Sequence, residues 1–252
     1  MKQITITFAP LQSPINGRYV TARGLHGLLF NALKQADPDE ATWLHGHPSP
    51  KPYSMAPLYT EAGHLAGLRV SAIDERSSSL LSRAWSWHGR RHTTFRLGRQ
   101  EFNVANVRDT DGPGWLQLAR SQARHQMTLD FLSPTAFKQG PGHLTLPLPR
   151  NVFDWPLRVW ERHGPPHTLP QDWTGWCDRN VFVTDHQIQT ATVNISQREQ
   201  FTGFVGRVSF TAHQGDELQL AIWQALGQLA GFCGVGHKTT MGMGAVGWNG
   251  VS

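Results

Sequence analysis

Two neighbouring stretches near the start of the chain decide the fold: QITITFA at residues 3–9 and ARGLHGLLFNALKQ at residues 22–35. The first alternates apolar and polar residues, which is typical of a strand with one buried face. The second has apolar residues at helical spacing, namely Leu25, Leu28, Leu29, Ala32 and Leu33. A half-buried strand that leads into an amphipathic helix predicts an α+β fold, in which helices cover one face of a sheet.

A second, shorter helix is expected directly after this one. Asp37 suits an N-cap, Pro38 suits the first helical position, and Glu40 would complete a capping box. We expect this helix to end at residues 44–45, with Gly46 as its C-terminal stop.

The rest of the first half completes one supersecondary pattern. Residues 53–59 and 65–73 are predicted strands joined through Gly63, residues 77–87 a helix, and residues 95–107 an extended segment. The resulting order is β-α-β-β-α-β, which is the ferredoxin-like arrangement.

The same order returns from about residue 126. The predicted elements are a strand at 127–131, a helix at 154–163, extended segments at 181–183, 190–195 and 204–211, a helix capped by Asp216, and a last strand at 244–248. We therefore predict two ferredoxin-like, RRM-like domains in tandem. The turn signal Asp111-Gly-Pro-Gly, within residues 109–125, separates an N-terminal domain (1–120) from a C-terminal domain (121–252).

Composition narrows the class of protein. The chain has 252 residues, is 39% hydrophobic, and carries 23 Lys+Arg against 18 Asp+Glu, so it can bury a core and favours polyanions. Its 13 histidines could add positive charge beside phosphates. Two distant cysteines, Cys177 and Cys233, argue against a disulfide framework and against a cysteine-based zinc site.

The expected compartment follows from what the sequence lacks. Residues 1–8 resemble a strand and not a signal peptide, and no apolar run is long enough to span a bilayer. We expect a soluble protein in a reducing, cytoplasmic setting.

The stretch LHGHPSPKPYS at residues 44–54 is the first candidate site. His45 falls at the end of the second predicted helix, where the helix dipole favours the imidazolium form, and Lys51 follows six residues later. An acid/base group beside a fixed cation is what cleavage of a phosphodiester needs. A solvated surface histidine and a solvated loop lysine are the plain alternatives.

Two further histidines lie close enough to share the chemistry. His26 lies one turn before Phe30 on the first helix and either faces a ligand or sits at the edge of the core. His47 lies two residues after His45 and either shares the proton transfer or is exposed to solvent. The sequence does not choose between these alternatives.

The second candidate site is the glycine-rich segment GFCGVGHKTTMGMG at residues 231–244. Its spacing is close to that of a P-loop, but a P-loop follows a strand and precedes a helix, whereas here a helix comes first, so an NTPase is disfavoured. The glycines allow close approach of backbone to phosphates, with charge from Lys238, or they form a plain structural turn.

Basic and aromatic side chains also gather after residue 82. Cations that follow phosphates and rings that stack on bases suit a nucleic-acid surface, although a solvated basic hairpin with two core tryptophans fits equally well. The residues are Arg83, Trp85, Trp87, Arg90, Arg91, His92, Phe95, Arg96 and Arg99. Among the tryptophans, we expect Trp173 and Trp176 to be the most exposed.

With these residues assembled, the chain resembles the CRISPR-associated endoribonucleases that process precursor CRISPR RNA, within the repeat-associated mysterious protein (RAMP) superfamily. Four segments in family order carry the resemblance: residues 27–33 with the Asp37 helix, Leu44-His45 with Lys51-Pro-Tyr-Ser54, FLSPTAF at 131–137, and GVGHKTTMGMG at 234–244.

The resemblance implies tandem ferredoxin-like folds and cleavage of CRISPR repeat RNA without metal or cofactor, by attack of a 2′-hydroxyl that leaves a 2′,3′-cyclic phosphate and a 5′-hydroxyl. His45 falls on the general acid/base position and Lys51 on that of a lysine that steadies the phosphorane. Where some members have a tyrosine, this chain has Phe30, so His26, His47 or Tyr53 would activate the 2′-hydroxyl, or His45 would act largely alone.

The resemblance also implies the partners. These are CRISPR repeat RNA and a CRISPR effector complex, with the chain a monomer or a homodimer and no membrane involved. The residues expected to hold RNA are Gly234, Gly236, His237, Lys238, Gly242, Gly244, Arg90 and Arg91. A second hypothesis is a non-cleaving RNA-binding subunit of an effector complex; His45 and Lys51 argue against it and Phe30 argues for it.

Overall fold

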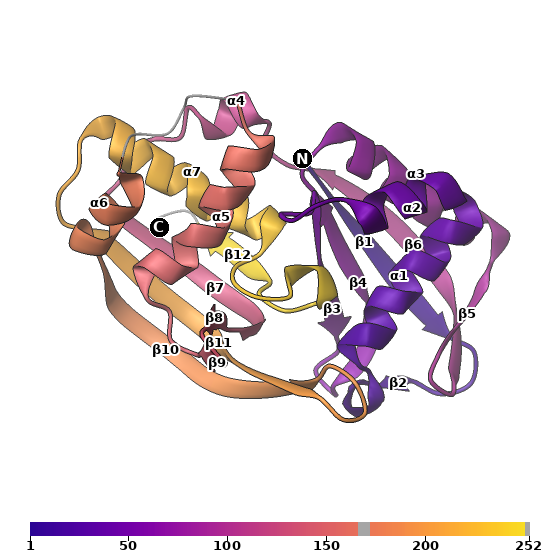
Figure 1. Ribbon diagram of the computed structural model, residues 1–252. Helices are drawn as coiled ribbons and strands as arrows, with labels where there is room; N and C mark the ends of the chain where they lie inside the picture. Colours follow the sequence, from indigo (N-terminus) through magenta and orange to yellow (C-terminus); the bar gives the residue numbers. More distant parts are fainter. Residues whose placement is uncertain (166–171, 250–252) are drawn as a thin grey trace. The chain divides into compact units, whose positions relative to one another are not determined.

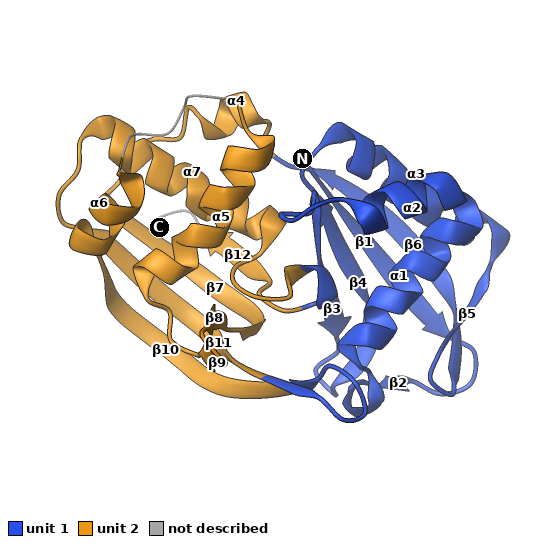
Figure 2. Cartoon of the chain, in the orientation of Figure 1, with its two compact units in different colours: residues 1–112, 193–201, 240–242 blue, residues 113–192, 202–239, 243–252 orange. Residues whose placement is uncertain are grey.

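A computed structural model describes residues 1–165 and 172–249. The chain forms two compact units (Figures 1 and 2). Unit 1 consists of residues 1–112, 193–201 and 240–242, and unit 2 of residues 113–192, 202–239 and 243–252. Each unit has its own antiparallel sheet and its own helices, and together they have the tandem ferredoxin-like fold that the sequence predicts.

The sheet of unit 1 has the strand order β3-β4-β1-β6 at its centre. In strand β1 (Lys2–Pro10), Ile4 and Ile6 are fully buried and face Val70 and Leu68 of strand β4 (His64–Ala72) across an antiparallel ladder. The remaining strands are β2 (Ile15–Asn16), β3 (Tyr53–Tyr59), β5 (Thr94–Leu97) and β6 (Gln100–Asp111).

Three helices cover one face of this sheet (Figure 1), namely α1 (Ala22–Ala36), α2 (Pro38–Gly46) and α3 (Glu75–Arg91). Asp37 caps α2 as expected, because its side chain accepts from the Glu40 backbone N–H. The other half of the predicted capping box is replaced, since the Glu40 carboxylate instead accepts two hydrogen bonds from Arg76. Gly46 is the last helical residue of α2, not a residue beyond its end.

One predicted element of unit 1 is wrong. Residues 95–107 are not a single extended segment but a hairpin of β5 and β6. The turn between them contains Gly98 at φ +64°, a backbone conformation that glycine adopts without steric cost. A glycine inside a strand pattern is a turn signal of this kind.

Unit 2 repeats the arrangement with the strand order β10-β11-β7-β12. Its large sheet pairs β7 (Gln126–Thr135) with β11 (Gln200–Ala212) and β12 (Val246–Asn249), and β10 (Val181–Asn194) is one long strand where the sequence predicted two extended segments. A separate hairpin joins β8 (Phe137–Gln139) to β9 (Gly142–Leu144).

The helices of unit 2 are α4 (Trp115–Leu118), α5 (Pro149–His163), α6 (Trp173–Asn180) and α7 (Glu217–Cys233). Asp216 caps α7 with Gln219 in a full capping box. The expected exposure of Trp173 and Trp176 is wrong, because both are buried and lie on α6 with their rings in contact. Short 3-10 turns at Gly17–Tyr19 and Thr239–Met241 complete the chain.

Candidate active site

Three elements of unit 1 bring the predicted catalytic residues around one phenylalanine ring. Phe30 on α1 lies 4.8 Å, centroid to centroid, from the rings of both His26 and His45. It also lies 6.1 Å from the ring of Tyr53, the first residue of β3. Residues 26 and 30 are one helical turn apart and therefore share a face of α1. Phe30 is itself buried, and the rings of His26, His45 and Tyr53 pack against it.

His45 is the exposed member of this group. It is the second-last residue of α2, and its ring meets Phe30 edge-on at an interplanar angle of 90°. The ring centroids of His45 and His26 are 5.9 Å apart. An imidazole that is held from one side and open to solvent on the other can meet a large substrate without a change in the fold.

Lys51 binds the end of the same helix. Its ammonium group donates hydrogen bonds to the carbonyl oxygens of Leu44, at 3.5 Å, and of His45. Carbonyls at a helix C-terminus lack helical partners and carry partial negative charge, so a cation is favourable there. Burial lowers the pKa of Lys51. The lysine thus fixes the backbone of His45, and the third of its three N–H groups remains for a ligand.

His26 has a different environment from His45. It is half-buried, and its Nε2 lies 3.5 Å from the hydroxyl of Tyr53. Burial lowers the pKa of His26, and the nearby charges of His45 and Lys51 lower it further. The neutral imidazole, which can accept a proton, is therefore favoured.

Tyr53 supports this histidine from inside the core. The side chain is 1% exposed, and burial raises the pKa of its hydroxyl, which also forms a hydrogen bond with Thr240. The phenol stays protonated at neutral pH for this reason. It can orient His26, but it is poorly suited to carry negative charge.

His47 lies against a different partner. Its ring meets Trp43 edge-on at 5.6 Å, and its Nδ1 is 2.8 Å from the carbonyl oxygen of Pro48. The guanidinium of Arg76 covers Trp43 at 3.9 Å from the ring centroid. The structure therefore groups His26, His45 and Tyr53 around Phe30, with Lys51 bound to the backbone of His45. The ring of His47 instead contacts Trp43.

The glycine-rich segment follows α7 and packs tightly in unit 2. Gly236 has φ +80°, and a Cβ there would lie 2.6 Å from the carbonyl oxygen of Ala136. A Cβ on Gly244, at φ +66°, would lie 2.0 Å from the carbonyl oxygen of Val235. These two glycines are therefore required by backbone packing, and the contact of the segment with phosphates stays a prediction.

His237, which the sequence predicted to hold RNA, has a second histidine beside it that the sequence did not reveal. The ring of His143 on β9 lies 5.4 Å from that of His237. Burial lowers the pKa of His237, and Lys238, His143 and Lys138 lower it further, so four groups that can carry positive charge converge. The run Gln139-Gly-Pro-Gly142 is a turn signal that could have located the hairpin, although not its contact with residue 237.

The basic and aromatic cluster divides into core and surface. Trp85 and Phe95 are buried, whereas Arg90 and Arg91 are exposed, and the Arg91 guanidinium lies 4.4 Å from the centroid of the Trp87 ring. Both cysteines are free and buried. Within residues 1–165 and 172–249, no group of three or more His, Cys, Asp or Glu side chains could hold a metal ion, and no helix is long and apolar enough to cross a membrane.

The tandem ferredoxin-like fold is shared with a RAMP protein of known structure, which is 12% identical and has a TM-score of 0.63, with 99% of this chain and 100% of that chain covered. The family model for the CRISPR-associated endoribonuclease Cas6 matches residues 129–246. A Thermus thermophilus Cas6, in a structure of its product complex, is 26% identical and has a TM-score of 0.84, with 98% of this chain and 99% of that chain covered. The chain is thus similar to the Cas6 family model over residues 129–246, and to the fold of a Cas6 structure over nearly its whole length.

More distant structures agree on the fold. A second Cas6 product complex is 24% identical, with a TM-score of 0.77 and coverage of 98% of this chain and 100% of that one. A Cas6-related protein from Pyrococcus furiosus is 14% identical, with a TM-score of 0.62 and 99% coverage of both chains. No curated protein sequence matches the chain significantly.

Proposed function

We propose that this protein cuts CRISPR repeat RNA in precursor transcripts to release guide RNAs. The reaction is attack of a ribose 2′-hydroxyl on the adjacent phosphate, without a metal ion, which leaves a 2′,3′-cyclic phosphate and a 5′-hydroxyl. The match of residues 129–246 to the Cas6 family model and the likeness to a Cas6 product complex support the substrate. The observation that carries the chemistry is the pair of imidazoles, one exposed and one half-buried, on the Phe30 ring.

His45 is the proton donor to the leaving 5′-oxygen in this proposal. The leaving group departs as an alkoxide unless a proton reaches it, so an acid at this point accelerates cleavage by about 10²–10⁴-fold. His45 is the exposed member of the pair and lies beside the Lys51 ammonium. Both features suit a group that must reach a phosphate on the protein surface.

His26 is the base that takes the proton of the 2′-hydroxyl. Phe30 has no proton to exchange, so another group must act, and His26 is the neighbour that the site keeps neutral. Two titratable groups whose environments separate their protonation states divide acid and base roles between them. Tyr53 holds the imidazole by its hydroxyl and so acts as a positioning residue.

Lys51 stabilises the phosphorane as its negative charge grows. Its ammonium is already fixed by the carbonyl oxygens of Leu44 and His45 and needs no reorganisation when the charge develops. The RNA strand is also held in unit 2, by His237 and Lys238 and by the backbone of Gly234, Gly236 and Gly244. Lys138 and His143 join this group because they lie beside His237. Gly242 and Thr240 belong to the part of the segment grouped with unit 1.

One observation favours a second candidate function, a subunit that binds repeat RNA within an effector complex without cutting it. Phe30 occupies the centre of the site and cannot transfer a proton. If His26 does not act as the base, the site would retain affinity for phosphate but little activity.

The test uses 5′-labelled repeat RNA from the neighbouring array, with wild-type protein and His45→Ala in excess EDTA. We expect a single cut ending in a cyclic phosphate, lost in the variant while RNA affinity is kept. Tight binding without a cut would establish the binding subunit instead. A cut that survives the substitution would keep the enzyme and move the acid to His26 or His47.

A further inference from the structure

Helix α3 carries arginines at a seven-residue interval. Arg76, Arg83 and Arg90 are all exposed, and seven residues amount to almost two helical turns, so the three side chains share one face. Their spacing along the helix axis is about 10.5 Å, from a rise of about 1.5 Å per residue. This arginine row is a line of cations on a rigid element, which suits a chain of phosphates and not a single ion.

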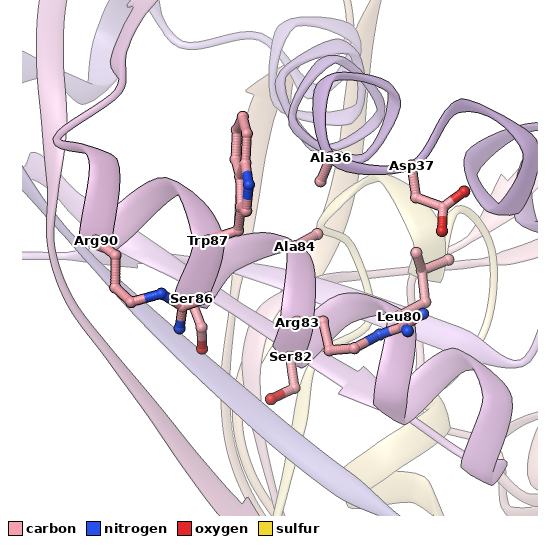
Figure 3. A pocket seen from close by; sticks show the side chains of 9 residues that line it. All are labelled: Ala36, Asp37, Leu80, Ser82, Arg83, Ala84, Ser86, Trp87 and Arg90. Carbon is pink, nitrogen blue, oxygen red and sulfur yellow. The ribbon is translucent and has the colours of Figure 1, made fainter.

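A surface hollow of about 480 Å³ lies along the row (Figure 3). Its wall includes Arg83, Arg90 and Trp87 of α3, and Ala36 and Asp37 at the junction of α1 and α2. A volume of this size is within the range of about 300–1,000 Å³ for small-molecule sites, so it can admit one nucleotide. The Arg91 guanidinium already lies over one face of the Trp87 ring, so a base packs against the part of the indole that lines the hollow.

The arginines of the row differ in their partners. Arg76 is paired with Glu40 and stacks on Trp43, so its charge is already largely used. Arg83 and Arg90 form no hydrogen bond and no ion pair within the described residues, although Arg83 feels the charge of Glu40 at longer range. The guanidinium groups of Arg83 and Arg90, which lie beside Trp87, can therefore bind phosphates. The Asp37 carboxylate at the rim is engaged as the N-cap of α2.

We infer that the hollow on α3 binds a single-stranded segment of RNA that flanks the repeat, with phosphates on Arg83 and Arg90 and one base against Trp87. A single strand is specified because only an unstacked base can enter a hollow and meet an aromatic ring. The inference rests on the proposed function for its ligand. None of the cleavage residues lines the hollow, so the hollow adds affinity outside the reacting groups; these residues are His26, His45, Lys51 and Tyr53.

The experiment compares two RNAs, the repeat alone and the repeat with an unpaired extension of about ten nucleotides at either end, a length within known single-strand sites. The affinity of wild type and of Arg83→Ala/Arg90→Ala is measured by fluorescence anisotropy over a range of salt. Loss of two phosphate contacts to a single strand reduces the slope of log affinity against log salt by about 1.4. We expect this change for an extended RNA and not for the repeat alone, so Arg90, which the sequence analysis predicted to hold the repeat, is assigned here to the RNA that flanks it.

Two controls separate this inference from the proposed function. Arg120→Ala/Arg162→Ala removes the same charge from exposed positions of unit 2 and leaves the preference for the extended RNA intact. The rate of a single turnover at saturating repeat RNA is the same in wild type and in Arg83→Ala, because Arg83 lines the hollow and is not among the residues predicted to hold the repeat. An unchanged slope with the extended RNA, or an equal change with the control pair, overturns the inference. Absence of cleavage by the wild type bears on the proposed function alone.

Discussion

The two units share a strand order but differ in where they keep their histidines. In unit 1, His26 and His45 come from two consecutive helices and rest on a buried phenylalanine. In unit 2, His143 and His237 come from a hairpin and a glycine-rich loop and rest on each other. The same fold therefore supports two kinds of site, because the connections between strands and not the sheet carry the chemistry.

The surroundings of the two pairs also differ. Unit 1 separates its histidines, with one exposed and one half-buried beside a tyrosine hydroxyl. In unit 2, positive charge from Lys238, His143 and Lys138 acts on His237. Separated environments suit proton transfer from one group and to another. Positive charge around His237 suits the binding of an anion. We therefore propose that unit 1 cleaves the RNA and that unit 2 binds it.

The strongest test of this division of roles is to replace one histidine by alanine in each unit. We expect His45→Ala to lower the single-turnover cleavage rate by about 10²–10⁴-fold, because the leaving oxygen loses its acid. His237→Ala should change that rate by less than threefold at saturating RNA. Quenched-flow cleavage of labelled repeat RNA measures both. Equal losses in the two variants would contradict the division of roles.

The acid side of the pH–rate profile tests His26. Its pKa is lowered by burial, so the neutral, proton-accepting form persists below the ordinary histidine pKa of about 6.5. We expect the wild-type rate to fall only as the pH drops below that value. His26→Ala should slow cleavage by about 10²-fold, within the range for a lost general base, and remove that limb of the profile. A limb that persists unchanged in the variant would assign it to another group.

Lys51 tests whether charge in unit 1 serves cleavage. Its ammonium group binds carbonyl oxygens at the C-terminal end of α2. We expect Lys51→Met, which keeps the length of the side chain, to lower the cleavage rate by about 10–100-fold through loss of charge beside the phosphate. Lys51→Arg restores part of the rate if charge is what matters. Circular dichroism of both variants shows whether α2 is retained. Full activity in Lys51→Met would leave the lysine a structural role only.

The fold was predictable because alternation and helical spacing persist through each unit. Ile4 and Ile6, read as the inward face of a strand, are indeed fully buried, and Asp37 and Asp216 cap their helices as predicted. The errors occur where tertiary contacts decide. Glu40 leaves its own cap for Arg76, which is 36 residues away in the sequence.

The candidate site was predictable in part for the same reason. His45 and Lys51 are close in sequence, and His26 is one helical turn from Phe30. Sequence spacing alone therefore predicts that each of these two pairs lies close together. The contact of Tyr53 with His26, and that of His143 with His237, join residues from separate elements. No pattern within either segment indicates such a contact. Trp173 and Trp176 were misassigned because burial by α6 packing leaves no mark on a loop-like sequence.

The salt dependence of RNA affinity tests whether unit 2 binds the RNA. Lys138→Ala/Lys238→Ala removes two cations beside His237. We expect affinity for repeat RNA to fall by about tenfold and the salt slope to decrease by about 1.4 to 1.8, according to whether the contacted RNA is single- or double-stranded. The cleavage rate at saturating RNA should stay within threefold of wild type. An unchanged slope in this variant would remove unit 2 from RNA binding.

The smallest expected effect is on stability, and it concerns one buried polar residue on the last helix of each unit. In unit 1, His88 on α3 is buried, with its Nε2 2.8 Å from the Ala32 carbonyl oxygen. In unit 2, Gln224 on α7 is equally buried and donates to the carbonyl oxygens of Arg124 and Gln126. Both hold a helix to backbone beside it, but only His88 titrates, and burial lowers its pKa.

The sign of the pH dependence follows from that shift. A histidine whose pKa is lowered by folding stabilises the protein above its unfolded value of about 6.5, and this contribution is lost as the pH falls and the unfolded chain takes up the proton. His26 and His237 shift in the same direction, so the wild type should lose stability as the pH falls through about 6.5. We expect His88→Gln, which copies unit 2, to make that loss smaller in urea unfolding, because one group with a lowered pKa is removed. An identical loss in Gln224→Ala and wild type, with a smaller one in His88→Gln, assigns the difference to the histidine. An equal loss in all three proteins would mean that His88 does not bind a proton on unfolding.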